Sequence, residues 1–282
     1  MKRWIAGLFC MLLTCTAYAG PNDLRKTAEA SMLVTGWIDV APDGSVHDYT
    51  IDRPEKIPPS VIDLIQKSIP GWKFHFAEHV DAIQRAKMNL RIIARPIDDQ
   101  HDSVAISGAT FGDGGASATD HVTFKDRPPP KYPRAAVDAR VNGTVFLLLR
   151  VGRQGQVEDA AVEQVNLGVY GREAQMAHFR SVLGDAALEA ARKWTYNLPS
   201  TGSHVMDPYW YVRVPVAFNL RVMGTPHENN YGKWEPYIPG PRASIPWAKN
   251  DNRLSSSSDA IPEGGISQAD PLLQLTTALG GA

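Results

Sequence analysis

The stretch GTVFLLLRV, residues Gly143–Val151, decides the fold of the second half of the chain. It is rich in leucine and β-branched residues and too short for most helices, so it predicts a strand that is buried on much of both faces. Residues 153–156 follow as a turn in which Gly155 can adopt a positive φ. Residues 157–165 then alternate well enough to predict a second strand. The two runs together predict a β-hairpin.

A helix and a closing strand follow the hairpin. After a loop at Gly168–Gly171, Asp185 is placed to cap a helix over residues 186–194, with two cations at its C-terminal end. The final strand, residues 211–222, places one set of apolar side chains on a single face: Val212, Val214, Val216, Phe218 and Leu220. Pro215 cannot donate a hydrogen bond to a neighbouring strand, so this strand is expected at a sheet edge or with a bulge. Residues 128–222 are therefore expected to form an α+β domain, a small antiparallel three-stranded sheet with a helix on one face.

Six short patterns occur in order within residues 128–222: Tyr132-Pro133-Arg134-Ala135-Ala136, Gly143-Thr144-Val145, Gly155-Gln156-Val157, Ala186-Ala187-Leu188, Arg192-Lys193-Trp194 and Pro215-Val216-Ala217-Phe218-Asn219-Leu220. Taken together they resemble the TonB C-terminal domain family over about 95 residues. The resemblance implies a periplasmic protein-interaction module of energy-coupled transport. It also implies a mode of binding, in which a segment of an outer-membrane transporter adds as a strand to an open sheet edge.

The resemblance also indicates where such a partner would bind. Strand 211–222 would supply the edge, which makes its apolar residues Val212, Val214, Val216, Phe218 and Leu220 the candidate partner-binding set, bracketed by Tyr132 and Pro133. A structural role for Tyr132 and Pro133 stays open, because a proline can fix the entry of the chain while the ring packs on the sheet. For Trp194 we expect core packing rather than partner contact.

Residues 1–19 depart from the energy-transducing members of that family. They contain neither the long membrane helix nor its Ser-x-x-x-His pattern, and a long Pro-Glu/Pro-Lys spacer is missing. A basic start, a thirteen-residue apolar stretch and Ala17-Tyr18-Ala19 predict instead a signal peptide cut after Ala19. A retained anchor and a lipoprotein signal at Cys15 are the alternatives. We therefore expect a periplasmic binding module without its own connection to the proton-driven motor.

Residues 32–97 echo the later domain. Gly36–Val40 parallels the strand that begins at Gly143, and Asp43–Asp48 parallels the turn at Gly155. A capped helix follows from Pro59, and Trp72–Phe74 parallels Trp194–Tyr196 before a closing alternating run. The sequence thus predicts a degenerate copy of the same unit, with chance similarity between short α+β domains as the alternative.

Two further segments differ in composition. Residues 98–127 are polar and glycine-rich and are expected to form a linker, with a short strand near residues 104–106. Residues 225–282 contain seven prolines and six glycines and are expected to be mostly disordered, apart from a short apolar turn or helix over residues 271–279. In this tail, Trp234 and Trp247 are either ordinary packing residues or anchors for a partner.

The side chains that could act in catalysis or bind a metal do not form a recognisable site in the sequence. His75 and His79 would share a helix face, but the surrounding residues alternate as in a strand, so we expect no metal, cofactor or catalytic site. Without Lys2 and Arg3 the chain has 29 − 2 = 27 basic against 30 acidic residues, which argues against a nucleic-acid partner. The alternative function is an envelope ligand-binding protein or enzyme accessory, which would need a polar pocket between the two repeats.

Overall fold

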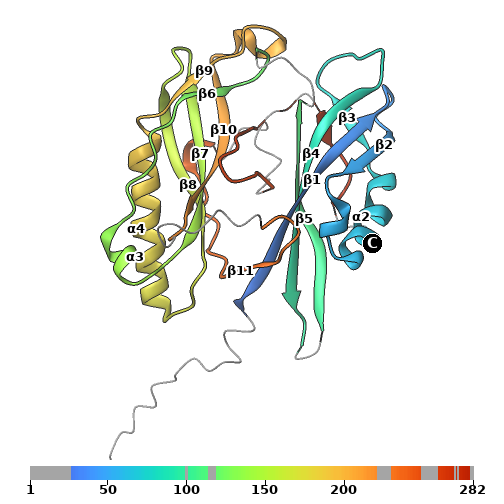
Figure 1. The fold of residues 1–282 in the computed structure, drawn as a ribbon. Coiled ribbons are helices and arrows are strands. Elements are labelled where there is room, and N and C mark those ends of the chain that lie inside the picture. Colours follow the sequence, from blue (N-terminus) through green and yellow to red (C-terminus); the bar gives the residue numbers. More distant parts are fainter. Residues whose placement is uncertain are drawn as a thin grey trace, which may run out of the picture.

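The protein forms two α+β units and a C-terminal segment that returns to both of them (Figure 1). The computed structural model describes residues 27–98, 101–113, 119–220, 230–248, 260–269, 271 and 273–279. The expected signal peptide, residues 1–19, lies outside the described residues. None of the described helices is long and apolar enough to cross a membrane.

The second unit has the strand order expected from the sequence. β7 (Gly143–Gly152) and β8 (Val157–Leu167) form the hairpin, and β10 (Tyr209–Phe218) pairs with β7 along its whole length. Helix α4 (Glu173–Ala191) packs against one face of this sheet. Four short elements complete the unit: β6 (Thr123–Asp126), α3 (Arg134–Asp138), β9 (Thr195–Asn197) and a 3₁₀ turn at Ser203–Met206, where β6 pairs with β9.

Helix α4, Glu173–Ala191, starts much earlier than the sequence suggested. Its N-cap residue is Arg172, so the prediction that Asp185 caps the helix is wrong. Gly184 obscured the earlier turns, because glycine is a poor helix former. The structure explains this glycine: a Cβ at Gly184 would lie 3.3 Å from a methyl carbon of Val162 on β8. The helix therefore approaches the sheet closely at Gly184, where it has no Cβ atom.

The first unit is a larger sheet with a helix on one face. β1 (Glu29–Val40) pairs with both β2 (Val46–Ile51) and β4 (Gln84–Pro96). Helix α2 (Pro59–Ser68) ends in a 3₁₀ turn at Ile69–Gly71, as Pro70-Gly71 suggested, and packs over the core of this sheet. β3 (Phe74–Phe76) follows the helix, and a 3₁₀ turn at Pro54–Lys56 precedes it.

The glycine-rich stretch after residue 98 differs from the expected linker. Residues 102–113 form β5, a full strand that pairs with β4 from Pro96↔Asp102 to Ala86↔Asp113. Ile106 and Phe111 of this strand are buried in the first core. The small residues between them suit a strand that shifts register beside Arg91 and Ile92 of β4.

The two units share a turn that is tied to the strand following the helix. Gly44 has a φ of 79°, and its carbonyl oxygen accepts a hydrogen bond from Phe74 N–H at 2.8 Å. Gly155 has a φ of 77°, and its carbonyl accepts from Tyr196 N–H at 2.7 Å. In both units a buried tryptophan lies two residues before that donor. Gly44 and Gly155 therefore make the same kind of turn, each bonded to the strand after the helix of its unit.

The C-terminal segment differs from the expected disordered tail. It contributes β11 (Glu235–Tyr237) to β1, β12 (Ser267–Gln268) to β10 and β13 (Leu273–Leu275) to β3. A 3₁₀ turn, Pro246–Ala248, lies between the first two strands. Residues 273–275 thus form a strand rather than the expected helix or turn. The segment gains order from sheet edges that the two units already provide.

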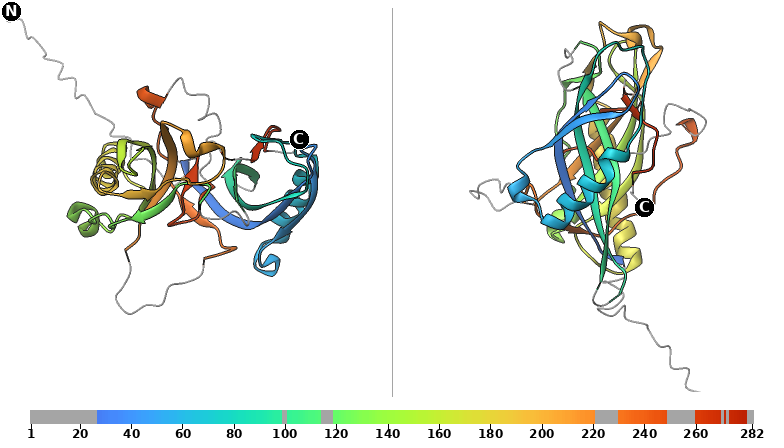
Figure 2. Two further views of the ribbon diagram at one scale, coloured as in Figure 1. Left: turned by 90° about the horizontal axis from the view of Figure 1, so that it is seen from above. Right: turned by 90° about the vertical axis from the view of Figure 1, so that its right-hand side faces the viewer.

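The layers are helix, sheet, sheet and helix, with parts of the C-terminal segment between the sheets (Figure 2). Each helix covers the far side of its own sheet, so the other faces of the two sheets look toward each other. A small third cluster on the face of the second sheet opposite α4 joins Leu148 and Tyr211 to Ile245, Ala248 and Ala269 of the C-terminal segment. The segment therefore buries a sheet face that would otherwise be apolar and exposed.

Candidate protein-interaction site

The apolar residues of β10 that the sequence singled out lie mostly in the core. Val212 and Val214 are fully buried, and Val216 and Phe218 are 3% and 2% exposed beneath α4. Leu220, which follows the strand, is 40% exposed. The four buried side chains hold β10 in place, and what this strand can offer to a partner is its backbone edge.

Tyr132 and Pro133 lie beside the far end of the same strand. The Tyr132 hydroxyl donates to the carbonyl of Val141 at 2.7 Å and reaches the carbonyl of Phe218 at 3.3 Å. Its ring packs edge-on against Phe218, with centroids 5.3 Å apart, and burial raises the pKa of the phenol above its usual value. Pro133 is the N-cap residue of α3. Both residues therefore fix the entry of the chain into the unit.

Alternate residues of β10 present their backbone groups to the side away from β7. Ala269 N–H donates to the Tyr211 carbonyl at 3.0 Å, which shows that odd-numbered residues face this outer edge. Arg213 lies opposite Ser267 in the short ladder with β12. Pro215 has the same parity, so its missing N–H falls on the outer edge and the ladder with β7 stays intact. β10 is therefore not the edge strand or bulged strand that the sequence predicted, because the short β12 lies outside it, but β12 pairs with only two of its residues.

Arg127 covers the next part of this edge. Its guanidinium donates to the carbonyl of Pro215 at 3.3 Å and to the carbonyl of Gly264 at 2.8 Å. The same group lies over the rings of Phe124 and Trp194, at 4.4 and 5.0 Å from their centroids. Burial lowers the pKa of Arg127, which nevertheless stays charged at neutral pH. Arg127 thus connects the edge of β10 to the turn that leads into β12.

Trp194 itself is a core residue, as expected. It is 1% exposed, and its indole N–H donates to the carbonyl of Pro128 at 2.9 Å. In the C-terminal segment, Trp234 packs against the first core and Trp247 stacks on Tyr211, with ring centroids 5.8 Å apart. Packing is therefore the role that the structure gives these two tail tryptophans.

A largely buried ion pair lies on the face of β10 opposite α4. Arg213 Nε is 3.0 Å from a carboxylate oxygen of Glu163 on β8, and the two side chains are 8% and 16% exposed. The backbone of Glu163 is also occupied, because its carbonyl accepts from Ala243 N–H at 2.8 Å. The C-terminal segment therefore covers both margins of the second sheet.

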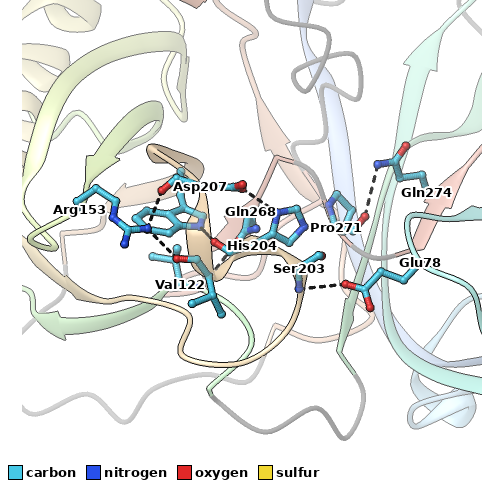
Figure 3. A network of polar contacts seen from close by, with 11 residues as sticks. Glu78, Val122, Arg153, Ser203, His204, Asp207, Gln268, Pro271 and Gln274 are labelled. Carbon is cyan, nitrogen blue, oxygen red and sulfur yellow. Dashed lines mark hydrogen bonds and ion pairs between the residues drawn. The ribbon is translucent and has the colours of Figure 1, made fainter.

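Several polar contacts lie beside β12, among them a direct hydrogen bond between the two units (Figure 3). Ser203 N–H donates to Glu78 Oε1 of the first unit at 3.0 Å, and Val122 N–H reaches Gln268 Oε1 at 3.3 Å. His204 Nδ1 lies 2.9 Å from Asp207. A cavity of about 240 Å³ opens here, and its lining includes Asn89 and Thr110 of the first sheet. This is the place at which the ligand-binding alternative requires a polar pocket.

The described residues contain no group of three or more side chains with metal-binding chemistry. His75 lies on β3 and is exposed, and His79 contacts Asp81 at 2.8 Å. The alternation around Trp72–Phe76 thus indicated the strand correctly, and a shared helix face does not exist.

Sequence reasoning missed two contributors to the edge of β10, namely Arg127 and residues 266–269. Arg127 directly precedes a proline run, and no local pattern connects it to a strand almost ninety residues later. Residues 266–269 lie in a segment with the composition of a disordered tail. Only the folded chain brings either of them to β10.

Part of this chain is similar in sequence to proteins named TonB. A stretch of 108 residues is 36% identical to the protein named Protein TonB from Xanthomonas campestris pv. campestris, in strain B100 and equally in strain ATCC 33913. The match covers 38% of this chain and 41% of each relative, so it spans less than half of their length. No family model matches the chain. The comparisons therefore support a TonB-like domain within this protein.

Proposed function

We propose that this chain is a periplasmic TonB-like interaction module, which accepts an extended segment of an outer-membrane transporter along β10 in energy-coupled transport. The similarity to TonB supports the general class, an envelope protein of energy transduction. Strand addition suits such a task because main-chain hydrogen bonds supply affinity while alternate side chains supply specificity. Tyr132 and Pro133 would shape one end of the edge, and the buried face of β10 would keep the strand rigid.

One observation carries this proposal: the outer edge of β10 is long, while its present cover is short. The strand runs for ten residues, but its ladder with β12 comprises only Val212↔Gln268 and Arg213↔Ser267 among the described residues. Ala217 has the same parity as Tyr211 and Arg213, so its N–H also faces this edge. Unpaired strand edges are the usual templates for an added strand.

The test uses synthetic peptides with the periplasmic N-terminal sequences of outer-membrane transporters from the same genome, measured by fluorescence anisotropy. Ala217→Pro removes one outward N–H, and Ala217→Val keeps it while adding similar bulk. Because one hydrogen bond contributes about 0.5–1.5 kcal/mol, the proline variant should bind roughly three- to tenfold more weakly, with the valine variant close to wild type.

Two controls make this result interpretable. The ladder with β7 should survive in Ala217→Pro, because Pro215 already occupies an equivalent outward position, and circular dichroism checks that both variants fold. If no transporter segment bound the wild-type protein, or if both variants bound it equally well, strand addition at β10 would be rejected.

We also propose that the two units descend from one duplicated unit. This is supported by the equivalent positive-φ glycines Gly44 and Gly155, each bonded to the strand after the helix. A second support is that Trp72 and Trp194 each donate a hydrogen bond from the backbone N–H to the carbonyl three residues earlier. Only the later unit carries the Tyr-Pro entry, so we assign partner binding to that unit.

A further inference from the structure

The chain already places one of its own segments on the edge that the proposed function requires. Residues 266–269 run antiparallel to β10, with Ala269 N–H bonded to the Tyr211 carbonyl and Ser267 opposite Arg213. This is the geometry of an added strand, in which main-chain groups of the guest meet outward groups of the host. The occupant belongs to the same chain, so it competes directly with any incoming segment.

The side chains of this occupant fit separate features of the second unit. Ile266 packs against the main core cluster, and the Gln268 side-chain carbonyl accepts from Val122 N–H at 3.3 Å. Ala269 is 4% exposed and lies in the cluster that contains Tyr211 and Leu148. The resident pattern is therefore an apolar residue, a small polar residue, an amide and a small residue.

The occupant is held firmly in position but by few main-chain bonds. The turn before it, with a bond from Gly265 N–H to the Pro262 carbonyl at 2.8 Å, is attached to β10 through Arg127. The resident segment meets two outward-facing residues of β10, Tyr211 and Arg213. A segment that paired with every outward-facing residue from Tyr211 to Ala217 would meet four. A longer guest can thus replace the resident by exchanging a short ladder for a longer one.

We propose that residues 266–269 are a resident mimic of the partner, which occupies the β10 edge and must leave before a partner segment with a similar apolar–small–amide–small pattern can bind. This inference rests on the proposed strand addition and adds its regulation and the sequence class of the guest. Binding then depends on two steps, release of the resident and pairing of the guest, so the affinity measured for the intact chain is lower than that of the bare edge.

A disulfide lock tests the requirement for release. Val212 and Gln268 lie directly opposite each other in a pair without mutual main-chain bonds, the type in which Cα atoms approach to about 4.5 Å, close enough for a disulfide. The double variant Val212→Cys, Gln268→Cys is made in a protein of residues 20–282, which has no other cysteine. Its reduced form is the control for its oxidised form, since the two share one composition.

The probe is a labelled synthetic peptide with the sequence of residues 261–271, so the experiment does not depend on knowing the natural partner. Ala269→Pro removes the N–H that bonds to Tyr211, and Ala269→Gly, the matched control, keeps it. We expect Ala269→Pro to bind the peptide about fivefold more tightly than Ala269→Gly. The oxidised double variant should lose at least tenfold in affinity relative to its reduced form.

The outcomes separate this inference from the proposed function. Equal peptide binding by the oxidised and reduced forms, or no peptide binding by Ala269→Pro, overturns the resident mimic. If transporter segments bind oxidised and reduced protein equally, the resident mimic is also overturned, although the transport role survives at another edge. If the tail peptide follows the expected pattern while no transporter segment binds, the mimic is supported and the proposed partner is wrong.

Discussion

At the scale of single residues, Tyr132 illustrates a sequence pattern that is compatible with two roles. The Tyr-Pro pattern located the start of the domain, but it fitted both a partner contact and a packing role. The structure gives the hydroxyl two carbonyl acceptors, on Val141 and Phe218, and places the ring against Phe218. A sequence pattern cannot distinguish these roles, because the acceptors are backbone groups that any residue could supply.

Tyr132→Phe should lower the free energy of unfolding by about 0.5–1.5 kcal/mol, since it removes one partly buried hydroxyl and its hydrogen bonds. Urea unfolding at neutral pH measures the change. Tyr170→Phe is the matched control. Tyr170 is partly buried against the same core, and no hydrogen bond of its hydroxyl group is seen among the described residues. Equal losses in the two variants would contradict the assigned role.

The difference in unfolding free energy between wild type and Tyr132→Phe should depend on pH. Burial raises the pKa of Tyr132 in the folded state above its ordinary value near 10, so the phenol ionises first in the unfolded chain. The stability contributed by Tyr132 is complete below pH 10 and is lost as the pH rises further. The difference between wild type and Tyr132→Phe should therefore stay constant from pH 7 to about 9 and shrink above it.

At the scale of elements, strands with a clear period could be predicted, and those whose order depends on distant partners could not. β7, β8 and β10 follow from their own residues. β5 did not, because its glycines and small polar residues have the composition of a linker until Ile106 and Phe111 meet the core around Trp72. The start of α4 was missed because Gly184 weakens the local helix signal, and its reason is the close approach of β8.

The paired turns give a prediction at this scale. Alanine at Gly44 or Gly155 would need a positive φ, and its Cβ would lie 2.1 Å from the Phe74 carbonyl oxygen or 2.3 Å from that of Tyr196. We expect each substitution to cost at least about 2 kcal/mol of unfolding free energy. Gly71→Ala is the control, since nothing lies within 4 Å of its Cβ position and its φ is not positive. A near-neutral result at either turn would refute their equivalence.

At the scale of the whole molecule, the C-terminal segment shows what composition alone leaves out. Its prolines and glycines indicate that it cannot build a core of its own, and that inference is sound. The structured parts instead pair with edges of both units: β11 with β1, β12 with β10, and β13 with β3. Between them, Ile238 exchanges two main-chain bonds with Leu167 of β8. Sequence reasoning confined to one segment cannot include edges that other segments supply.

This arrangement makes the segment the main connection between the two units, and its removal has a measurable result. A chain that ends at Trp234 lacks β11, β12 and β13 and uncovers Leu148 and Tyr211 on the face of the second sheet opposite α4. Without the segment, the units keep only direct contacts such as the Ser203–Glu78 hydrogen bond, so they should move independently and unfold in two transitions instead of one. Small-angle scattering should show a larger radius of gyration, and a hydrophobic dye should bind the exposed face.

A chain ending at Leu279 keeps all three strands and should behave as wild type. If the shorter protein kept both its compact dimensions and a single transition, direct contacts between the sheets would be sufficient, and the segment would serve the β10 edge alone.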